Sequence, residues 1–108
     1  MTTIKIFKKQ NSIIGFECSG HTGYAENGKD IVCAAVSSLS LTCALALEEI
    51  AKLKTITRRD DKKGWLKIMI DGETNPQSQT ILQTFLLGIA QIQENYSKYI
   101  KLEEDNVF

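Results

Sequence analysis

The stretch of residues 30–53, DIVCAAVSSLSLTCALALEEIAKL, decides the fold because its apolar residues recur at intervals of three and four. This spacing places the apolar side chains on one side of an α-helix. Asp30 stands at the expected N-cap, where a carboxylate accepts hydrogen bonds from the N–H groups of the first turn. We predict a helix over residues 31–53, with a buried stripe formed by Val32, Ala35, Val36, Leu39, Cys43, Leu47, Ile50 and Leu53.

Two extended segments precede this helix. Residues 3–7 alternate apolar and polar side chains, and residues 10–12 form a turn sequence. A second segment follows that turn and places Ile14, Phe16 and Cys18 on one face. Two alternating runs joined by a short polar turn are typical of a β-hairpin.

The second half of the chain repeats this arrangement. Residues 55–59 and 65–70 read as two strands, and the charged residues 60–64 between them are expected to form a solvated hairpin tip. Asn75 and Pro76 indicate the start of a second helix. Gly88 within that helix indicates close packing against a neighbour. The apolar face of the helix consists of Ile81, Leu82, Phe85, Leu86, Ile89 and Ile92.

Residues 99–103 predict a short last strand, and the acidic residues 103–105 are expected to fray. The element order is therefore ββαββαβ. It predicts a two-layer α+β fold in which two helices pack on one face of a mixed sheet. The length of 108 residues fits one domain, residues 1–108.

The composition limits the classes of partner. Thirteen basic residues balance thirteen acidic ones, so we expect no direct binding of nucleic acid. No apolar run is expected to span a membrane, since Ser and Thr interrupt the longest one. The three cysteines lack a C-x-x-C spacing, and the N-terminus reads directly into a strand. These features favour a reducing cytosol with free thiols.

His21 is the only histidine, and it lies in a glycine-rich loop of residues 19–29. Gly20 and Gly23 flank it, and Gly28 lies nearer the helix. Long loops in small domains are often functional. Imidazole is the usual general base near neutral pH, so His21 is a candidate catalytic residue.

Cys33 differs from the other cysteines by its position in the first turn of the predicted helix. Free N–H groups and the helix dipole at that point favour a thiolate, so we expect a lowered pKa for Cys33. Cys18 and Cys43 lie among apolar positions and are expected to be small buried side chains. The residues alone leave two interpretations open: a catalytic pair of Cys33 with His21, or an inert cysteine at a helix start.

The surroundings of Cys33 suggest further roles. The backbone N–H groups of Cys33 and Ala34 are candidates for an oxyanion hole. Ser37 shares a helix face with Cys33, together with Ser40, and is a candidate for a substrate groove. Asp30 has two possible roles, as a helix cap or as a group that orients the imidazole.

A metal site formed by His21, Cys33 and Asp30 or Glu26 is the weaker alternative to a catalytic pair. One histidine without clustered cysteines falls short of a structural zinc site. We therefore expect neither a metal nor a cofactor.

The segments GHTGYA (residues 20–25) and GKDIVCAAVS (residues 28–37) resemble the signature of the ribosomal-processing cysteine protease family of bacteria. The resemblance covers the whole chain in length and element order. It implies a catalytic histidine at His21, a nucleophile at Cys33, the family's acidic residue at Asp30 and its helix serine at Ser37. One departure is Thr22, where the family commonly has alanine.

The resemblance also implies a substrate and an assembly. The family removes the N-terminal extension of the twenty-seventh protein of the large ribosomal subunit, cutting after a pair of phenylalanines. The resemblance further implies a homodimer, and a loop before the helix that stays flexible until substrate orders it. The alternative function is a ribosome-assembly factor that binds such a component without cutting it.

Overall fold

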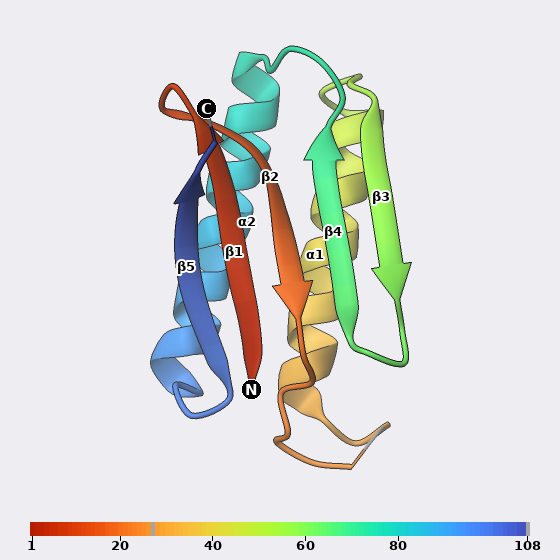
Figure 1. Ribbon diagram of the computed structural model, residues 1–108, viewed down its shortest axis with the longest axis vertical. Coiled ribbons are helices and arrows are strands. Elements are labelled where there is room, and N and C mark those ends of the chain that lie inside the picture. The colour runs from red at the N-terminus through yellow and green to blue at the C-terminus, as the bar shows by residue number, and fades with distance from the viewer. Residues whose placement is uncertain (27, 108) are drawn as a thin grey trace.

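The computed structural model describes residues 1–26 and 28–107 as seven elements in the predicted order ββαββαβ (Figure 1). They are β1 (Thr2–Lys9), β2 (Ser12–Ser19), α1 (Ile31–Glu49), β3 (Thr55–Asp60), β4 (Trp65–Ile70), α2 (Pro76–Asn95) and β5 (Ile100–Asn106).

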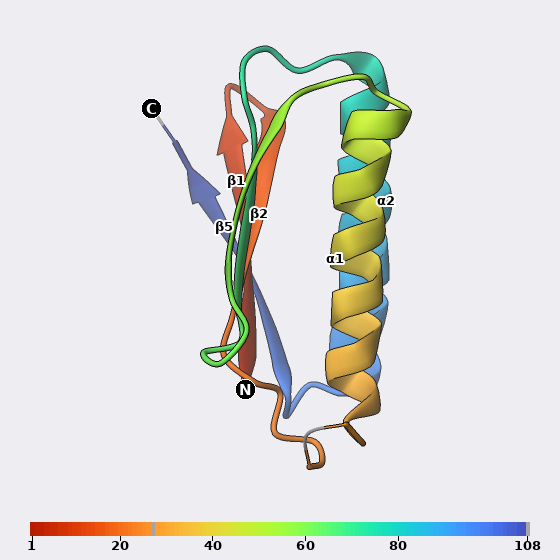
Figure 2. The same cartoon turned by 90° about the vertical axis from the view of Figure 1, so that its right-hand side faces the viewer.

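The strands form one mixed sheet in the order β3-β4-β2-β1-β5. Strands β1 and β5 pair in parallel, and the other neighbours pair antiparallel. Figure 2 shows both helices on the same face of this sheet. The prediction of a two-layer α+β fold is therefore confirmed.

The core lies between the sheet and the helices. Phe16 of β2 stacks on Phe85 of α2 with ring centroids 4.1 Å apart. The α1 stripe buries Val32, Val36, Cys43 and Leu47. Gly88 of α2 packs closely against α1, as predicted, because a Cβ there would lie 2.9 Å from a methyl carbon of Leu39. The fully buried apolar side chains of the sheet are Ile4, Ile6, Phe16, Ile68 and Ile100.

The first helix ends four residues earlier than predicted, at Glu49. Ile50 is the C-cap and is 59% exposed, so its place in the buried stripe was wrong. Lys52 takes a left-handed φ of 59°, which an α-helix does not accommodate. Leu53 still packs against the core from beyond the helix end.

A β-bulge changes the inward face of β2. The register pairs Phe7 with Gly15 but Lys8 with Ile13, which leaves Ile14 as the extra residue. Ile13 therefore joins the core, while Ile14 is only half-buried. The prediction that Ile14 shares the face of Phe16 was wrong because the alternation is interrupted at this point.

The acidic end of the chain is ordered into the sheet instead of frayed. Strand β5 continues to Asn106, and Ile6 pairs with Glu104 in the parallel register. The Lys8 ammonium forms an ion pair with the Glu104 carboxylate at 3.0 Å. Backbone pairing with β1 therefore outweighs the low strand preference of these residues.

Helix α1 is long and apolar enough to cross a membrane, by length and composition alone. This finding differs from the expectation that no apolar run is long enough to span a membrane. The core helix of a soluble protein meets the same criterion. In this fold, α1 packs its buried face against the sheet and α2.

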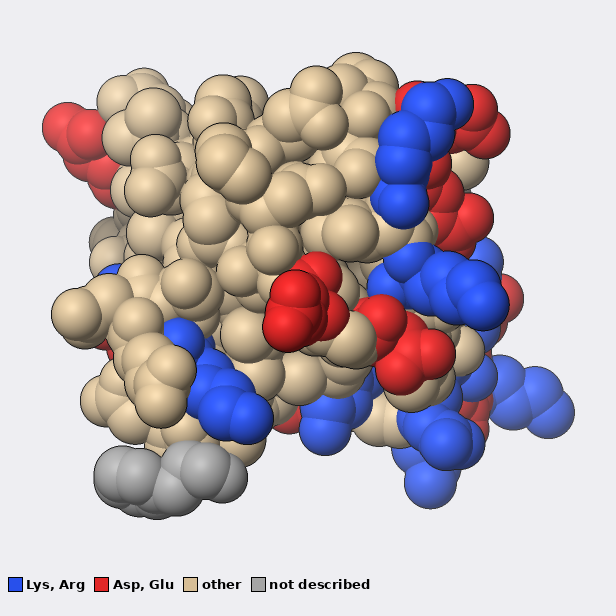
Figure 3. Space-filling model, turned by 90° about the horizontal axis from the view of Figure 1, so that it is seen from above, with Lys and Arg blue, Asp and Glu red and all other residues tan. Residues whose placement is uncertain are grey.

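Charges of both signs are interspersed on the end of the molecule seen from above. Figure 3 shows Lys and Arg mainly on the β3 side, with Asp and Glu between them and a broad uncharged surface beside them. This mixture on that face accords with equal numbers of basic and acidic residues in the sequence.

We predict that Phe85→Ala lowers the free energy of unfolding by about 3–5 kcal/mol, because it removes a buried ring and leaves a cavity. Leu87→Ala on the same helix is the matched control. Leu87 is 71% exposed, and its loss should change stability by less than about 0.5 kcal/mol. Urea denaturation of both variants measures the difference; equal effects would contradict the packing described here.

Candidate active site

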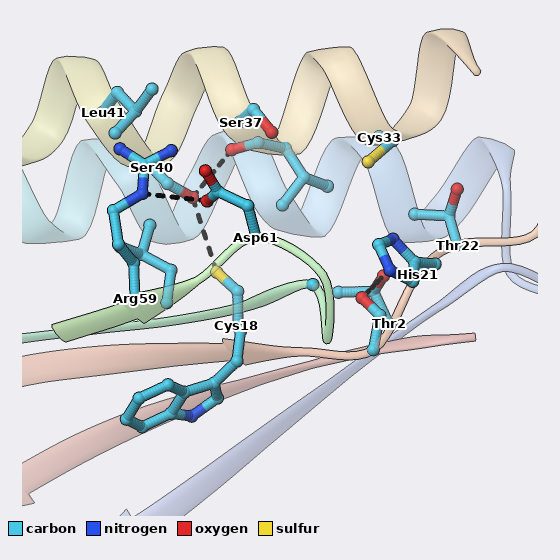
Figure 4. Close-up of a pocket in the computed structure, with 15 residues that line it drawn as sticks. Thr2, Cys18, His21, Thr22, Cys33, Ser37, Ser40, Leu41, Arg59 and Asp61 are labelled. Carbon is cyan, nitrogen blue, oxygen red and sulfur yellow. Dashed lines mark hydrogen bonds and ion pairs between the residues drawn. The ribbon is translucent and has the colours of Figure 1, made fainter. Parts of the chain in front are cut away.

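His21 and Cys33 lie in one cleft between the start of α1 and the β3–β4 hairpin. Both residues line each of two adjoining cavities. Figure 4 shows Cys33 extending from α1 and His21 below it, on the chain that leaves β2. The structure thus places His21 and Cys33, the two candidate residues from the sequence, in the same cleft, although they are twelve residues apart in the sequence.

Asp30 caps α1 and also accepts hydrogen bonds from the preceding loop. Its Oδ1 accepts a hydrogen bond from the Cys33 N–H at 2.9 Å. Its Oδ2 accepts from the Thr22 hydroxyl and from the N–H groups of Tyr24 and Ala25. One carboxylate therefore connects the loop to the first turn of the helix.

These contacts change the acidity of Asp30. Partial burial raises its pKa, but hydrogen bonds from Thr22 and from the N–H groups of Cys33, Ala25 and Tyr24 together outweigh burial. The net pKa lies below the usual value of 3.8. The carboxylate is thus ionised throughout the neutral range.

Thr22 is buried, and its hydroxyl donates a hydrogen bond to the Asp30 carboxylate. Thr22 is therefore a structural part of the loop. An alanine there would leave the Asp30 carboxylate one donor fewer.

Cys33 is half-buried and is a free thiol. Burial, followed by the negative charge of Asp30, raises its pKa above 9.0, and the Ser37 hydroxyl opposes this shift only in part. The expected lowering of the pKa is therefore wrong for this conformation, because burial of the thiol and the charge of the capping carboxylate outweigh the helix N-terminus. Cys33 is a neutral thiol near pH 7.

The two candidate oxyanion-hole donors are both occupied. The Cys33 N–H donates to the Asp30 side chain, and the Ala34 N–H donates to the Asp30 carbonyl oxygen at 3.0 Å. In this conformation the helix cap uses the groups that the sequence suggested for an oxyanion.

The two serines near Cys33 have different surroundings. Ser37 is exposed and lines both cavities. Ser40 is buried, donates to the Val36 carbonyl oxygen at 2.7 Å, and lies 3.5 Å from the Cys18 sulfur. Ser40 is therefore a buried, bonded residue at the base of the first cavity, and Ser37 is the exposed serine that lines both cavities.

His21 receives its orientation from the β3–β4 hairpin. Its Nε2 lies 2.9 Å from the carbonyl oxygen of Lys62. A Cβ on Gly64 would lie only 3.0 Å from the ring atoms Cε1 and Nδ1. The partner of the imidazole is thus the hairpin tip, whereas the Asp30 carboxylate is engaged by the loop and the helix.

The hairpin tip (residues 60–64) is therefore more than the solvated turn that the sequence suggested. Lys62 and Asp61 line the second cavity beside His21. Asp61 also pairs with the Arg59 guanidinium at 2.9 Å, as Figure 4 shows. No local pattern marked this contact, because it depends on which strands are neighbours.

The loop between β2 and α1 is anchored at both ends in the described conformation; residue 27 lies outside the described residues. Gly20 has a φ of +89°, and a Cβ there would lie 2.6 Å from the Met1 carbonyl oxygen. Tyr24 packs edge-on against Tyr96 and Tyr99 at 5.6 and 5.2 Å. Gly23 and Gly28 line the second cavity. Flexibility of this loop without substrate stays a prediction.

Metal binding finds no support in the described part of the chain, where no three His, Cys, Asp or Glu side chains gather into a site.

The model of the cysteine protease Prp family matches residues 1–101. The chain belongs to the Prp family of cysteine proteases. The ribosomal processing cysteine protease Prp of Staphylococcus aureus (strain Mu50 / ATCC 700699) is 32% identical over 83 residues, covering 77% of this chain and 78% of that protein.

Solved structures of Prp agree with this assignment. The S. aureus enzyme in complex with a covalently linked product peptide superposes with a TM-score of 0.91 at 28% identity, covering 97% of this chain and all of that one. The same protease in complex with a substrate peptide gives a TM-score of 0.85 at 27% identity, with the same coverage of both chains. The fold around the cleft is therefore the Prp fold.

We predict that Asp30→Asn destabilises the protein by about 1 kcal/mol near neutral pH, since the loop loses acceptors while the cap persists. The pKa of Asp30 is depressed in the folded state, so the ionised carboxylate stabilises the fold above pH 3.8. That contribution is lost as the pH falls through the folded pKa. The stability gap between variant and wild type should therefore close in acid. Thermal unfolding across that range measures it, and a constant gap would contradict the assignment.

We predict that iodoacetamide modifies Cys33 faster than Cys18 or Cys43. The latter two are buried, and burial raises their pKa values to about 11 and about 12. The rate at Cys33 should still rise with pH beyond 9.0, because its own pKa is raised. Mass spectrometry of the alkylated peptides gives the three rates, and equal rates would contradict the site.

Proposed function

We propose that this chain is the endopeptidase that removes the N-terminal extension of the twenty-seventh protein of the large ribosomal subunit. The cut falls after a pair of phenylalanines, and His21 and Cys33 form the catalytic dyad. Membership of the Prp family supports this proposal. The observation that carries it is the shared position of His21 and Cys33 between two cavities, which leaves room for substrate on either side of the sulfur.

The reaction follows from these two side chains. His21 takes the proton from the Cys33 thiol, and the sulfur attacks the carbonyl carbon before the scissile bond. His21 then gives that proton to the leaving amine as the C–N bond breaks. Water hydrolyses the resulting thioester and restores the thiol. The covalently linked product peptide of the S. aureus enzyme is consistent with such an acyl–cysteine intermediate.

The resting site requires activation by substrate. The pKa of Cys33 is raised, and the N–H groups of Cys33 and Ala34 are bonded to Asp30. A bound peptide that displaces the Asp30 side chain from the first turn of α1 frees the Cys33 N–H and moves negative charge away from the sulfur. Ser37, whose hydroxyl lowers the pKa of Cys33 and which lines both cavities, then faces the substrate carbonyl.

The first cavity suits an aromatic side chain. Its apolar lining includes Val36 and Leu41 on α1 and Leu66 on β4. A phenylalanine there would pack on aliphatic surface while its backbone passes Cys33. The second cavity, with Gly23, Ala25 and Ala34, suits the small residue after the cut.

A non-catalytic assembly factor is the alternative function. The raised pKa of Cys33 and the occupied N–H groups favour it, since both describe an inactive site. The alternative requires that the ribosomal extension binds and remains intact.

We also propose that the enzyme works in the cytosol as a homodimer. Three free cysteines suit a reducing compartment. The outer side of α1 carries the exposed apolar residues Ile31, Leu41 and Leu45, which a second copy could cover. Sedimentation velocity tests the dimer.

We predict that Cys33→Ala abolishes cleavage of a peptide that carries the extension and its Phe-Phe pair, while circular dichroism shows an intact fold. His21→Ala should lower kcat by about a hundredfold or more, because the general base is lost. Mass spectrometry of the peptide reports cleavage. Binding without cleavage by the wild-type protein would favour the alternative, and cleavage by Cys33→Ala would refute the dyad.

A further inference from the structure

The His21 ring makes its hydrogen bond to a backbone carbonyl. Nε2 lies 2.9 Å from the Lys62 oxygen. A carbonyl oxygen only accepts, so the proton of the neutral ring must be on Nε2. Nδ1 then holds the lone pair that a general base needs.

The sheet register explains why the hairpin tip meets this histidine. Strands β2 and β4 pair antiparallel with Cys18 opposite Leu66. Continuing that register by two residues sets Gly20 opposite Gly64, so the chain leaving β2 runs directly past the tip. The contact between His21 and Lys62 spans 41 positions of sequence.

Gly64 allows the ring to lie against the tip. It has a φ of +61°, and a Cβ there would lie 3.0 Å from Nδ1, Cε1 and the Gly20 carbonyl oxygen. Such distances are tighter than ordinary contacts, and two of these neighbours belong to the catalytic ring. A side chain at position 64 would therefore push the imidazole out of place.

The tip is itself held in shape. The Gly64 N–H donates to the Asp61 carbonyl oxygen at 3.3 Å, and the Lys63 N–H donates to the Asp60 carboxylate at 3.3 Å. The Arg59–Asp61 ion pair is exposed and adds little stability by itself. The backbone turn, more than the charges, sets the direction of the Lys62 carbonyl.

We propose that residues 60–64 are the positioning element of the catalytic histidine: the Lys62 carbonyl selects the Nε2–H tautomer, and Gly64 seats the ring so that Nδ1 is the base. This inference rests on the proposed function and deepens it. The proton of the Cys33 thiol passes to Nδ1 as the sulfur attacks, and Nε2–H continues to donate to Lys62. The proton then leaves Nδ1 for the amine as the C–N bond breaks.

The tautomer can be measured directly because His21 is the only histidine. In ¹⁵N-labelled protein, the imidazole nitrogens give one pair of signals. The proposal expects a protonated Nε2 and an unprotonated Nδ1 in the neutral ring. A neutral ring protonated on Nδ1 would overturn it, whether or not the protein cleaves a peptide.

Gly64→Ala tests whether the absence of a side chain at position 64 holds the His21 ring in place. Because small displacements of a catalytic group are costly, we expect kcat to fall by about 10–100-fold with KM nearly unchanged. The His21 ¹⁵N shifts should move with it. Gly64→Asn provides a second variant, since Asn tolerates positive φ but still adds a Cβ.

Gly72→Ala is the matched control for backbone strain. Gly72 has a φ of +109°, but a Cβ there would meet nothing within 4 Å. It follows β4 at the end of the sheet away from the cleft (Figure 1). Its substitution should leave kcat and the His21 signals unchanged. Wild-type shifts and kcat in both Gly64 variants would refute the positioning role. If the His21 signals shift in the Gly64 variants but the wild-type protein cuts no peptide, the positioning role stands and the proposed function is refuted.

Discussion

The Asp30 carboxylate is the interaction on which the arrangement of the cleft depends. One oxygen holds the first turn of α1 through the Cys33 N–H, and the other holds the loop through Thr22 and two backbone N–H groups. Without this link, the chain between His21 and Cys33 would depend mainly on the packing of Tyr24 against Tyr96 and Tyr99. The same charge raises the pKa of Cys33. Burial and, after it, this charge keep the thiol of the proposed nucleophile protonated, so order in the resting state opposes reactivity.

The histidine depends on a different part of the fold. Strand β4 lies beside β2, so the turn before β4 reaches the chain that leaves β2. Lys62 and Gly64 then contact the His21 ring from the β3–β4 hairpin, whereas Cys33 lies on α1. The two residues of the proposed dyad are thus held by different elements: Cys33 lies in the capped first turn of α1, and His21 is bonded to the β3–β4 hairpin.

Much of the fold could be predicted from the sequence because it depends on near neighbours. The spacing of Val32, Val36 and Leu47 indicated the buried face of α1, and those residues are buried. The exceptions have physical causes. The bulge at Ile14 comes from pairing with β1, and the order of the acidic C-terminal strand comes from its parallel register with β1. Neither pairing leaves a local mark that could have been recognised.

The sequence by itself determined the helix start, with Asp30 as its cap and Cys33 in its first turn, because a cap bonds residues only three positions apart. Its signature also indicated the protease family. Only the tertiary structure decided the partner of His21 and the direction of the Cys33 pKa shift. The histidine's partner comes from pairing of strands distant in sequence, which no residue type in the loop specifies. The pKa follows from burial and from the distance between two charges, which exist only once the loop is folded against the helix.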